Sequence, residues 1–90
     1  MPEAARISDP TNHAGIVIGP GCPTVIIDGM PAAVVGDLHI CGLKVPIHLP
    51  SQFIVGSATV MIGGKPALRV GDVAGCGANI SDGSPDVIIG

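Results

Sequence analysis

Five side chains in this sequence are of the kinds that bind zinc and similar metal ions: His13, His39, Cys41, His48 and Cys76. Imidazole nitrogen and thiolate sulfur are the usual zinc ligands in proteins, and a structural zinc site is closed by four of them. Exposed histidines and cysteines buried as small hydrophobes are the ordinary alternative for such residues. The metal hypothesis therefore depends on whether the fold brings these side chains together.

Three of the five candidates share one spacing. Each lies four residues after an aspartate, in the pairs Asp9 and His13, Asp37 and Cys41, and Asp72 and Cys76. The other two candidates are His39, just before Cys41, and His48, in the long connection that follows it. His39 and Cys41 are two residues apart, so in an extended chain they share a face and could exclude each other as ligands. The spacing alone leaves both of them open.

The aspartates belong to a longer repeat. Residues 23–42 and 58–77 align without gaps at an offset of 35, with 11 of 20 positions identical. A third copy is divided between the two ends of the chain, with its first half at residues 86–89 and its second half at residues 3–9. One repeat cannot bury its apolar face alone, so repeats pack against each other. We therefore predict a closed, pseudo-threefold body in which the termini meet and the candidate ligands lie in loops at one end.

The composition predicts short strands. Apolar residues make up 47% of the chain and are mainly Val and Ile, which favour strands, while 14 Gly and 9 Pro interrupt them. Asp28-Gly29 and Gly63-Gly64 are typical hairpin-turn dipeptides. The alternating strand residues of the three copies fit the core or a base surface, and we favour the core for Val25, Ile27, Val60, Ile62, Val87 and Ile89. We thus expect an all-β protein with a single domain over residues 1–90.

Charge and cysteine number exclude several classes of function. The net charge of −3 argues against nucleic-acid binding, which needs a basic face. No apolar run reaches the roughly 18 residues of a membrane span, and the first residues, MPEAARISDP, lack a signal-peptide pattern. Three cysteines cannot form a complete disulfide framework, which favours a reducing compartment. Cys22 aligns with Ser57 and Ser84 of the other copies, and we interpret it as a packing residue.

The repeats and their metal-ligand residues resemble those of the PAAR-repeat proteins over essentially the full chain. The family's Pro-Ala-Ala-Arg phrase occurs in altered form, because residues 3–6 read EAAR, residues 31–34 read PAAV and residues 66–69 read PALR. Residues 9–15 read DPTNHAG, similar to the family's Asp-Pro-Thr-x-His-Gly-Gly. Residues 36–41 read GDLHIC, similar to Gly-Asp-x-His-x-Cys, although Gly42 stands where the family has Pro. A further histidine is typical of the next loop, and His48 fits.

The resemblance implies a cone of short strands with a metal near its sharp tip. The metal is bound by three histidines and one cysteine, which selects His13, His39, His48 and Cys76 and disfavours Cys41. Zinc in a structural role is expected, and the same donors also suit ferrous iron. Such proteins are similar to tips of contractile injection machines. They cap and sharpen the trimeric β-helical spike of the type VI secretion system, the valine-glycine repeat protein, for membrane piercing.

From this resemblance we expect a structural protein and not an enzyme. One chain should bind each spike trimer, with effectors as further partners and a transient contact with the target membrane. The protein should be made in the cytoplasm without a signal peptide and then exported or injected with the apparatus. Some members carry effector domains as extensions, whereas this chain is expected to be a bare tip.

Three other functions fit part of the sequence. A tailed-phage baseplate spike tip would have the same architecture in a different machine. A small zinc hydrolase would use three histidines and an open position on the metal. Its general base is not evident, because Glu3 is the sole Glu and the three repeat aspartates lie in tight turns where turn capping explains them. A metal-storage protein is disfavoured, because storage needs many exchangeable sites.

Overall fold

The chain folds into short β-strands joined by tight turns. The computed structural model describes residues 2–12, 15–40 and 51–89. In chain order the strands are β1 (Ile16–Gly19), β2 (Cys22–Ile27), β3 (Met30–Ala32), β4 (Leu38–Ile40), β5 (Ser51–Gln52), β6 (Met61–Ile62) and β7 (Lys65–Pro66). No helix occurs in these described ranges, so the prediction of an all-β protein is confirmed. None of the described residues, accordingly, forms an apolar helix long enough to cross a membrane.

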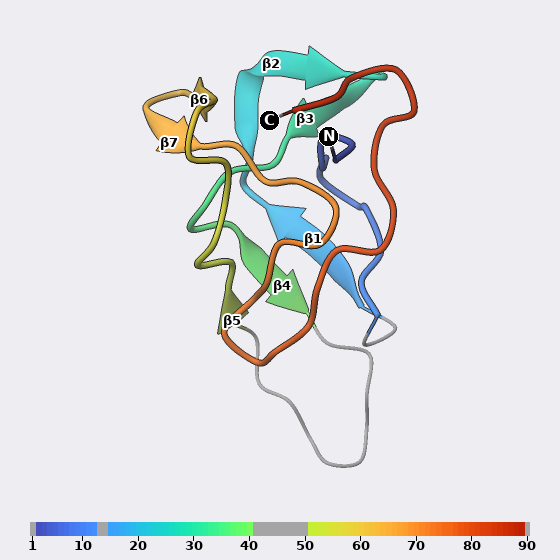
Figure 1. Ribbon diagram of the computed structural model, residues 1–90, viewed down its shortest axis with the longest axis vertical. Coiled ribbons are helices and arrows are strands. Elements are labelled where there is room, and N and C mark those ends of the chain that lie inside the picture. The colour runs from blue at the N-terminus through green and yellow to red at the C-terminus, as the bar shows by residue number, and fades with distance from the viewer. Residues whose placement is uncertain (1, 13–14, 41–50, 90) are drawn as a thin grey trace.

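The strands of the described residues form one sheet and two hairpins that lie at different ends of the molecule (Figure 1). The sheet has the antiparallel order β1-β4-β5, with Val17 opposite His39 and His39 opposite Ser51. The hairpins β2–β3 and β6–β7 lie near the two termini, at the other end. We call these two regions the sheet end and the terminal end.

Both predicted hairpin turns are present. Asp28 and Gly29 connect β2 to β3, and Gly63 and Gly64 connect β6 to β7. All four residues have positive φ, between 49° at Asp28 and 83° at Gly29. Positive φ at both central residues gives a two-residue turn whose twist matches that of the flanking strands. Glycine adopts this conformation without steric cost, and Asp is among the few other residues that tolerate it.

The two ends of the chain pair with each other, as the divided repeat predicted. Glu3 forms an antiparallel bridge with Ile88. The N–H of Ala4 donates to the carbonyl of Val87 at 2.8 Å, and the N–H of Ser84 donates to the carbonyl of Ala4 at 2.8 Å. The N-terminal and C-terminal segments therefore satisfy main-chain groups that each would otherwise expose at an edge.

Three residues at corresponding positions of the aligned copies form a closed cycle of main-chain hydrogen bonds. Ala5 N–H donates to Leu68 O at 3.0 Å, Leu68 N–H to Ala33 O at 3.0 Å, and Ala33 N–H to Ala5 O at 3.1 Å. A second cycle, with each bond at 2.9 Å, joins Ile7 to Pro31, Val35 to Pro66 and Val70 to Glu3. Each of the three segments is thus bonded to both of the others.

Adjacent residues of these segments face two different hydrophobic clusters, as side chains of an extended chain alternate. The central cluster contains the buried residues Ala5, Val17, Ala33, Phe53, Leu68, Ala74, Ala78 and Ile80. The terminal cluster contains the buried residues Ala4, Ile27, Ala32, Ala67 and Ile89, with Val25, Val60, Ile62 and Val87 packed against it. Of the six strand residues assigned to the core from their alternation, Ile27 and Ile89 are buried, which confirms the prediction for these two. The other four, Val25, Val60, Ile62 and Val87, are half-buried and pack against the terminal cluster.

Candidate metal centre

His39 is the middle residue of β4 and is completely buried. Leu38 and Ile40 on either side of it are exposed, because alternate side chains of a strand point to opposite faces of the sheet. The expectation that His39 lies in a loop is therefore wrong. The apolar residues around it pair in register with β1, with Ile16 opposite Ile40, and this pairing extends the strand through the histidine.

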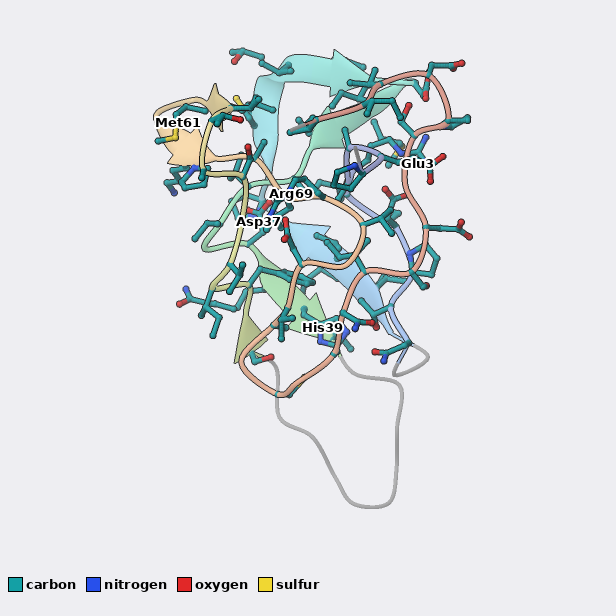
Figure 2. The ribbon with its side chains drawn as sticks, viewed as in Figure 1. Glu3, Asp37, His39, Met61 and Arg69 are labelled. Carbon is teal, nitrogen blue, oxygen red and sulfur yellow. The ribbon has the colours of Figure 1, made fainter. Side chains whose placement is uncertain are left out.

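Each edge of the His39 ring has a neighbour of defined chemistry. Its Nε2 lies 2.8 Å from Thr11 Oγ1 in a buried contact, and its Nδ1 lies 3.5 Å from Cys76 Sγ. The ring also meets Phe53 edge-on, with centroids 5.6 Å apart and planes inclined at 69°. A buried imidazole requires such partners, because an unpaired buried polar group costs free energy. Figure 2 shows His39 at the sheet end, far from Met61 at the terminal end.

Cys76 is presented by a turn between Ala74 and Ala78. The N–H of Ala74 donates to Ala78 O at 2.8 Å, and the N–H of Gly77 donates to Ala74 O at 2.9 Å. The N–H of Cys76 itself lies 3.3 Å from Ser51 Oγ, which ties the turn to β5. Cys76 is half-buried, packs against the central cluster, and is not in a disulfide.

The structure thus brings together two of the four predicted ligands, His39 and Cys76. The other two, His13 and His48, and the disfavoured candidate Cys41 lie outside the described residues. Within residues 2–12, 15–40 and 51–89, no group of three or more His, Cys, Asp or Glu side chains could hold a metal ion. The complete ligand set and the identity of the metal therefore stay predictions.

The pair fits a zinc site in two respects. With zinc–nitrogen and zinc–sulfur bonds of about 2.05 and 2.3 Å at a tetrahedral angle, nitrogen and sulfur lie about 3.5 Å apart, and the Nδ1–Sγ distance here is 3.5 Å. A histidine that binds zinc typically donates its other ring N–H to a nearby acceptor, and Thr11 Oγ1 is such an acceptor for Nε2. Imidazole nitrogen and thiolate sulfur are the donors that zinc prefers.

A comparison with models of protein families matches the PAAR motif over residues 7–82 and again over residues 54–90. The chain belongs to the PAAR motif family. A search of the curated proteins gave no match.

Three buried aspartates of this PAAR-motif protein cap tight turns, as predicted. These residues are 2–5% exposed, and their carboxylates accept a hydrogen bond from the N–H three residues earlier. The pairs are Asp9 with Arg6 at 2.6 Å, Asp37 with Val34 at 2.8 Å, and Asp72 with Arg69 at 2.7 Å. These bonds account for the aspartates structurally and leave no need to assign them a catalytic role.

The second partner of the carboxylate differs among the three turns. Asp9 and Asp72 each accept from a guanidinium, Arg6 or Arg69, with nitrogen–oxygen distances of 2.9 Å. The hydrogen bond to Asp9 raises the pKa of Arg6, and that to Asp72 raises the pKa of Arg69. Asp37 instead accepts the N–H of Gly21 at 2.9 Å. In the repeat in which Val34 stands at the Arg position of the PAAR motif, a main-chain hydrogen bond to Asp37 therefore takes the place of the ion pair that Asp9 and Asp72 each make.

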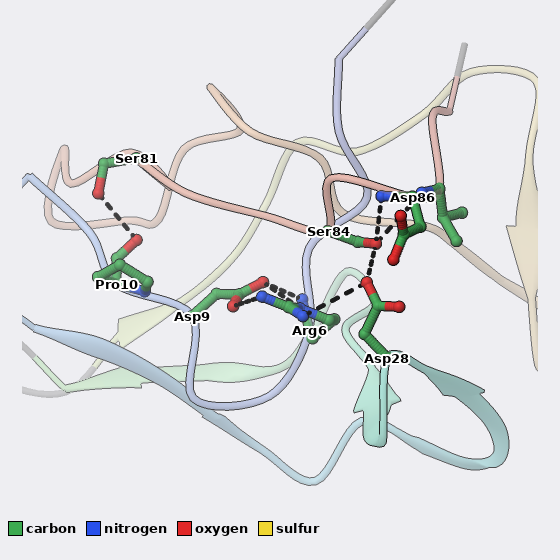
Figure 3. A network of polar contacts seen from close by, with 8 residues as sticks. Arg6, Asp9, Pro10, Asp28, Ser81, Ser84 and Asp86 are labelled. Atoms are coloured by element: carbon green, nitrogen blue, oxygen red, sulfur yellow. Dashed lines mark hydrogen bonds and ion pairs between the residues drawn. The ribbon is translucent and has the colours of Figure 1, made fainter.

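A polar network of the PAAR-motif protein joins both chain ends to the β2–β3 turn (Figure 3). The hydroxyl of buried Ser84 donates to Asp28 Oδ2 and accepts the N–H of Asp86 at 3.1 Å. Arg6 Nη1 lies 3.6 Å from Asp28 Oδ2. The bond from Ser84 lowers the pKa of Asp28, whereas the hydrogen bond and charge of Asp28 raise the pKa of Asp86.

This network was missed from the sequence, although one signal for it existed. In the aligned copies, Asp86 stands where the other two copies have Thr24 and Thr59. A charged residue that replaces a neutral one at one copy alone indicates a contact peculiar to that copy. Thr11 was missed as well, although it follows Asp9 by the same two positions by which His39 follows Asp37.

Cys22, interpreted from the sequence as a packing residue, also makes a polar contact. It is half-buried, and its Sγ lies 3.2 Å from Thr24 Oγ1. Hydrogen bonding by Thr24 lowers the pKa of this thiol. At the corresponding position, Ser57 Oγ accepts the N–H groups of Thr59 and Val60. The thiol therefore occupies a polar turn position, which explains why serine stands there in the other copies.

Proposed function

We propose that this PAAR-motif protein is a structural tip and not an enzyme. It caps and sharpens the trimeric β-helical spike, the valine-glycine repeat protein, of a type VI secretion machine. The observation that carries the proposal is the family match over residues 7–82 and 54–90. The protein is made in the cytoplasm, leaves the cell as part of the apparatus, and contacts the target membrane transiently while it is pierced. Effectors are further partners in this proposal.

A pseudo-threefold body suits a threefold partner, and the hydrogen-bond cycles support that arrangement. Ala5, Ala33 and Leu68 donate to one another in a closed sequence, and in the second cycle Ile7, Val35 and Val70 each donate to the next segment. Equivalent main-chain bonds that recur in three segments are expected when the segments are related by rotation about a common axis. We propose one chain per trimer, because a single chain of this symmetry completes the end of a three-chain β-helix.

Three exposed apolar side chains support the terminal end as the surface that meets the spike. Ile26 is 56% exposed, Met61 58% and Ile88 47%, and they occupy one position of the three aligned strands. The residues on both sides of each one pack against the terminal cluster. The three side chains therefore point away from that cluster, as alternation along a strand requires. Apolar groups left in water at three equivalent places suit a hydrophobic partner.

The spike contact is tested by co-expressing the chain with a trimeric valine-glycine repeat spike protein. We expect a native mass that corresponds to one chain per trimer. Replacing Ile26, Met61 and Ile88 together by Ser should weaken binding by at least about 10-fold, because each loses buried apolar area. The matched control replaces Ile16, Ile40 and Ile54, which are 42%, 45% and 64% exposed, by Ser. Undiminished binding by the first variant, or three chains per trimer, would contradict the proposal.

The second part of the proposal is a structural zinc clamp at the sheet end, formed by His13, His39, His48 and Cys76. The contact of His39 with Cys76 supports it, because it joins β4 to a turn 37 residues away. A bound metal would tie these segments together where apolar packing is limited, with a binding free energy on the order of 10 kcal/mol in small zinc domains.

The clamp is tested by replacing Cys76 and Cys41 separately by Ser. Loss of zinc and of thermal stability is expected for Cys76→Ser, measured by elemental mass spectrometry and thermal unfolding. Cys41→Ser is the matched control, and it should retain one zinc per chain. Full zinc retention by Cys76→Ser would remove this residue from the ligand set.

A further inference from the structure

Thr11 is held rigidly by its own backbone. Its N–H donates to Gly15 O at 2.9 Å, and it forms an antiparallel bridge with Ile80. The N–H of the next residue, Asn12, donates to Asn79 O at 3.0 Å. The side chain of Thr11 is itself buried, with 5% of the residue exposed. The hydroxyl therefore occupies a place that the framework determines, 2.8 Å from His39 Nε2.

The Nε2 edge of the His39 ring is also enclosed by backbone. A Cβ built on Gly15 would lie 2.7 Å from His39 Nε2 and 1.9 Å from the carbonyl oxygen of Ile40. Only a glycine allows the chain to pass so close to this edge of the ring. Phe53 restricts rotation of the same ring from another side. The other ring nitrogen, Nδ1, faces the thiol of Cys76, with 3.5 Å between Nδ1 and Sγ.

We infer that Thr11 is the positioning residue of the metal centre. Its hydroxyl accepts the Nε2 proton of His39, which fixes the tautomer whose Nδ1 lone pair binds the metal beside Cys76. Thr11 itself does not touch the metal. This inference rests on the proposed zinc clamp and specifies which nitrogen of His39 takes part and what holds it there.

The chemistry follows from the two nitrogens of a neutral imidazole, of which one carries the proton and the other the lone pair. If Nδ1 binds zinc, Nε2 must carry the proton, and that proton needs a buried acceptor. Valine has the shape of threonine but lacks the oxygen, so Thr11→Val removes the hydroxyl that accepts the Nε2 proton. Loss of such an outer partner typically costs about 10- to 100-fold in metal affinity.

The first measurement is the zinc affinity of the full chain by competition with a chromophoric chelator. Thr11→Val should bind zinc about 10- to 100-fold more weakly than the unchanged chain, and Thr11→Ser, which restores the hydroxyl, should recover most of the loss. Thr24→Val is the matched control, because it removes an exposed threonine hydroxyl at the terminal end. A purely structural role for Thr11 predicts no rescue by Ser, since Ser lacks the methyl group that packs.

The second measurement is the tautomer of His39 by long-range proton–nitrogen NMR of the zinc-loaded chain. We expect a protonated Nε2 and a metal-shifted Nδ1. A protonated Nδ1 would overturn the inference even if Thr11→Val fails to fold, and so would a zinc affinity of Thr11→Val within about twofold of the unchanged chain. If the unchanged chain binds no zinc, the clamp fails together with the inference. If the chain binds zinc and Thr11→Val binds equally well, only the inference fails.

Discussion

At the terminal end, main-chain pairing and aliphatic side chains close the structure, whereas at the sheet end a buried imidazole, hydroxyl and thiol meet. The terminal cluster consists of Ala, Val and Ile residues from all three aligned copies. At the sheet end, His39 of one copy makes polar contacts with Cys76 of another and with Thr11, which follows the divided third copy. The same repeat has therefore produced two kinds of closure.

The two ends differ in what their stability requires of each side chain. Aliphatic clusters tolerate substitutions that conserve side-chain volume, because van der Waals contacts have no preferred direction. A buried histidine is stable only while its nitrogens have partners in the correct geometry. We therefore expect the terminal end to tolerate aliphatic exchanges that conserve volume, and the sheet end to be sensitive to the loss of a single polar partner.

The largest effect is expected from removal of residues 1–9, which breaks the terminal end. The truncation deletes Ala4 and Ala5, which are buried in the two clusters, and the main-chain bonds they make with Val87 and Leu68. Cooperative unfolding monitored by circular dichroism should disappear. Glu3→Ala, which keeps the backbone, is the control and should stay folded. A stable truncated chain would contradict the closed arrangement.

Gly15→Ala should break the sheet end with one methyl group. The added Cβ would lie 1.9 Å from Ile40 O, and relieving this clash requires β4 and His39 to move. We expect a loss of about 3 kcal/mol in the free energy of unfolding and weaker zinc binding, measured by denaturant titration and chelator competition. Gly75→Ala is the matched control, since its nearest neighbour would be Ser51 Cβ at an ordinary 3.6 Å. Equal stability of the two variants would contradict this prediction.

Asp37→Ala tests the region between the two ends, where Figure 2 shows this residue. The variant leaves the N–H groups of Val34 and Gly21 without their acceptor. A loss of about 2 kcal/mol is expected from buried donors left unpaired, measured by denaturant titration. Asp82→Ala, at an exposed aspartate, should change stability by less than about 0.5 kcal/mol. If Asp37→Ala is as mild as the control, the turn does not depend on its carboxylate.

The smallest effect is expected from Asp86→Thr, which gives the third copy the residue of the other two. Asp28 raises the folded pKa of Asp86 above its usual 3.8. Folding therefore disfavours the ionised form of Asp86. This lowers stability at pH values above the folded pKa of Asp86, and the loss disappears as the pH falls through that pKa toward the ordinary value of an aspartate. Asp86→Thr should be slightly stabilising near neutral pH and lose this advantage in acid.

Urea unfolding midpoints across this pH range measure the effect of Asp86→Thr. Asp82→Thr, at another exposed aspartate of the C-terminal segment, is the control. A gain that stays constant with pH would show that the carboxylate pair is not its cause. A loss at neutral pH would show that Asp86 supports the terminal end instead of weakening it.

The features that the sequence predicted are those fixed by a few adjacent residues or by the repeat. The dipeptides Asp28-Gly29 and Gly63-Gly64 determine their turns through backbone conformation alone. The buried aspartates bond only three residues back along the chain. The pairing of Glu3 with Ile88 followed from a missing copy that the two ends together complete.

The features that could not be predicted depend on side chains of different copies. Thr11 and His39 are 28 residues apart, and Ser84 and Asp28 are 56 apart. The position of a residue within its repeat predicts which end of the molecule it lies at. It does not predict which rotamer the side chain adopts or which atoms come into contact. The strand through His39 was missed because pairing with β1 and β5 gives it an extended backbone, and that pairing is tertiary.

The pairing of the two chain ends also has a consequence for biosynthesis. Two main-chain partners of Ala4, Ser84 and Val87, are made at least 80 residues after it. Contacts between residues so distant in sequence slow folding, because a long loop must close before they form. The closed body therefore cannot form until Ser84 and Val87 have emerged from the ribosome, long after Ala4 has done so.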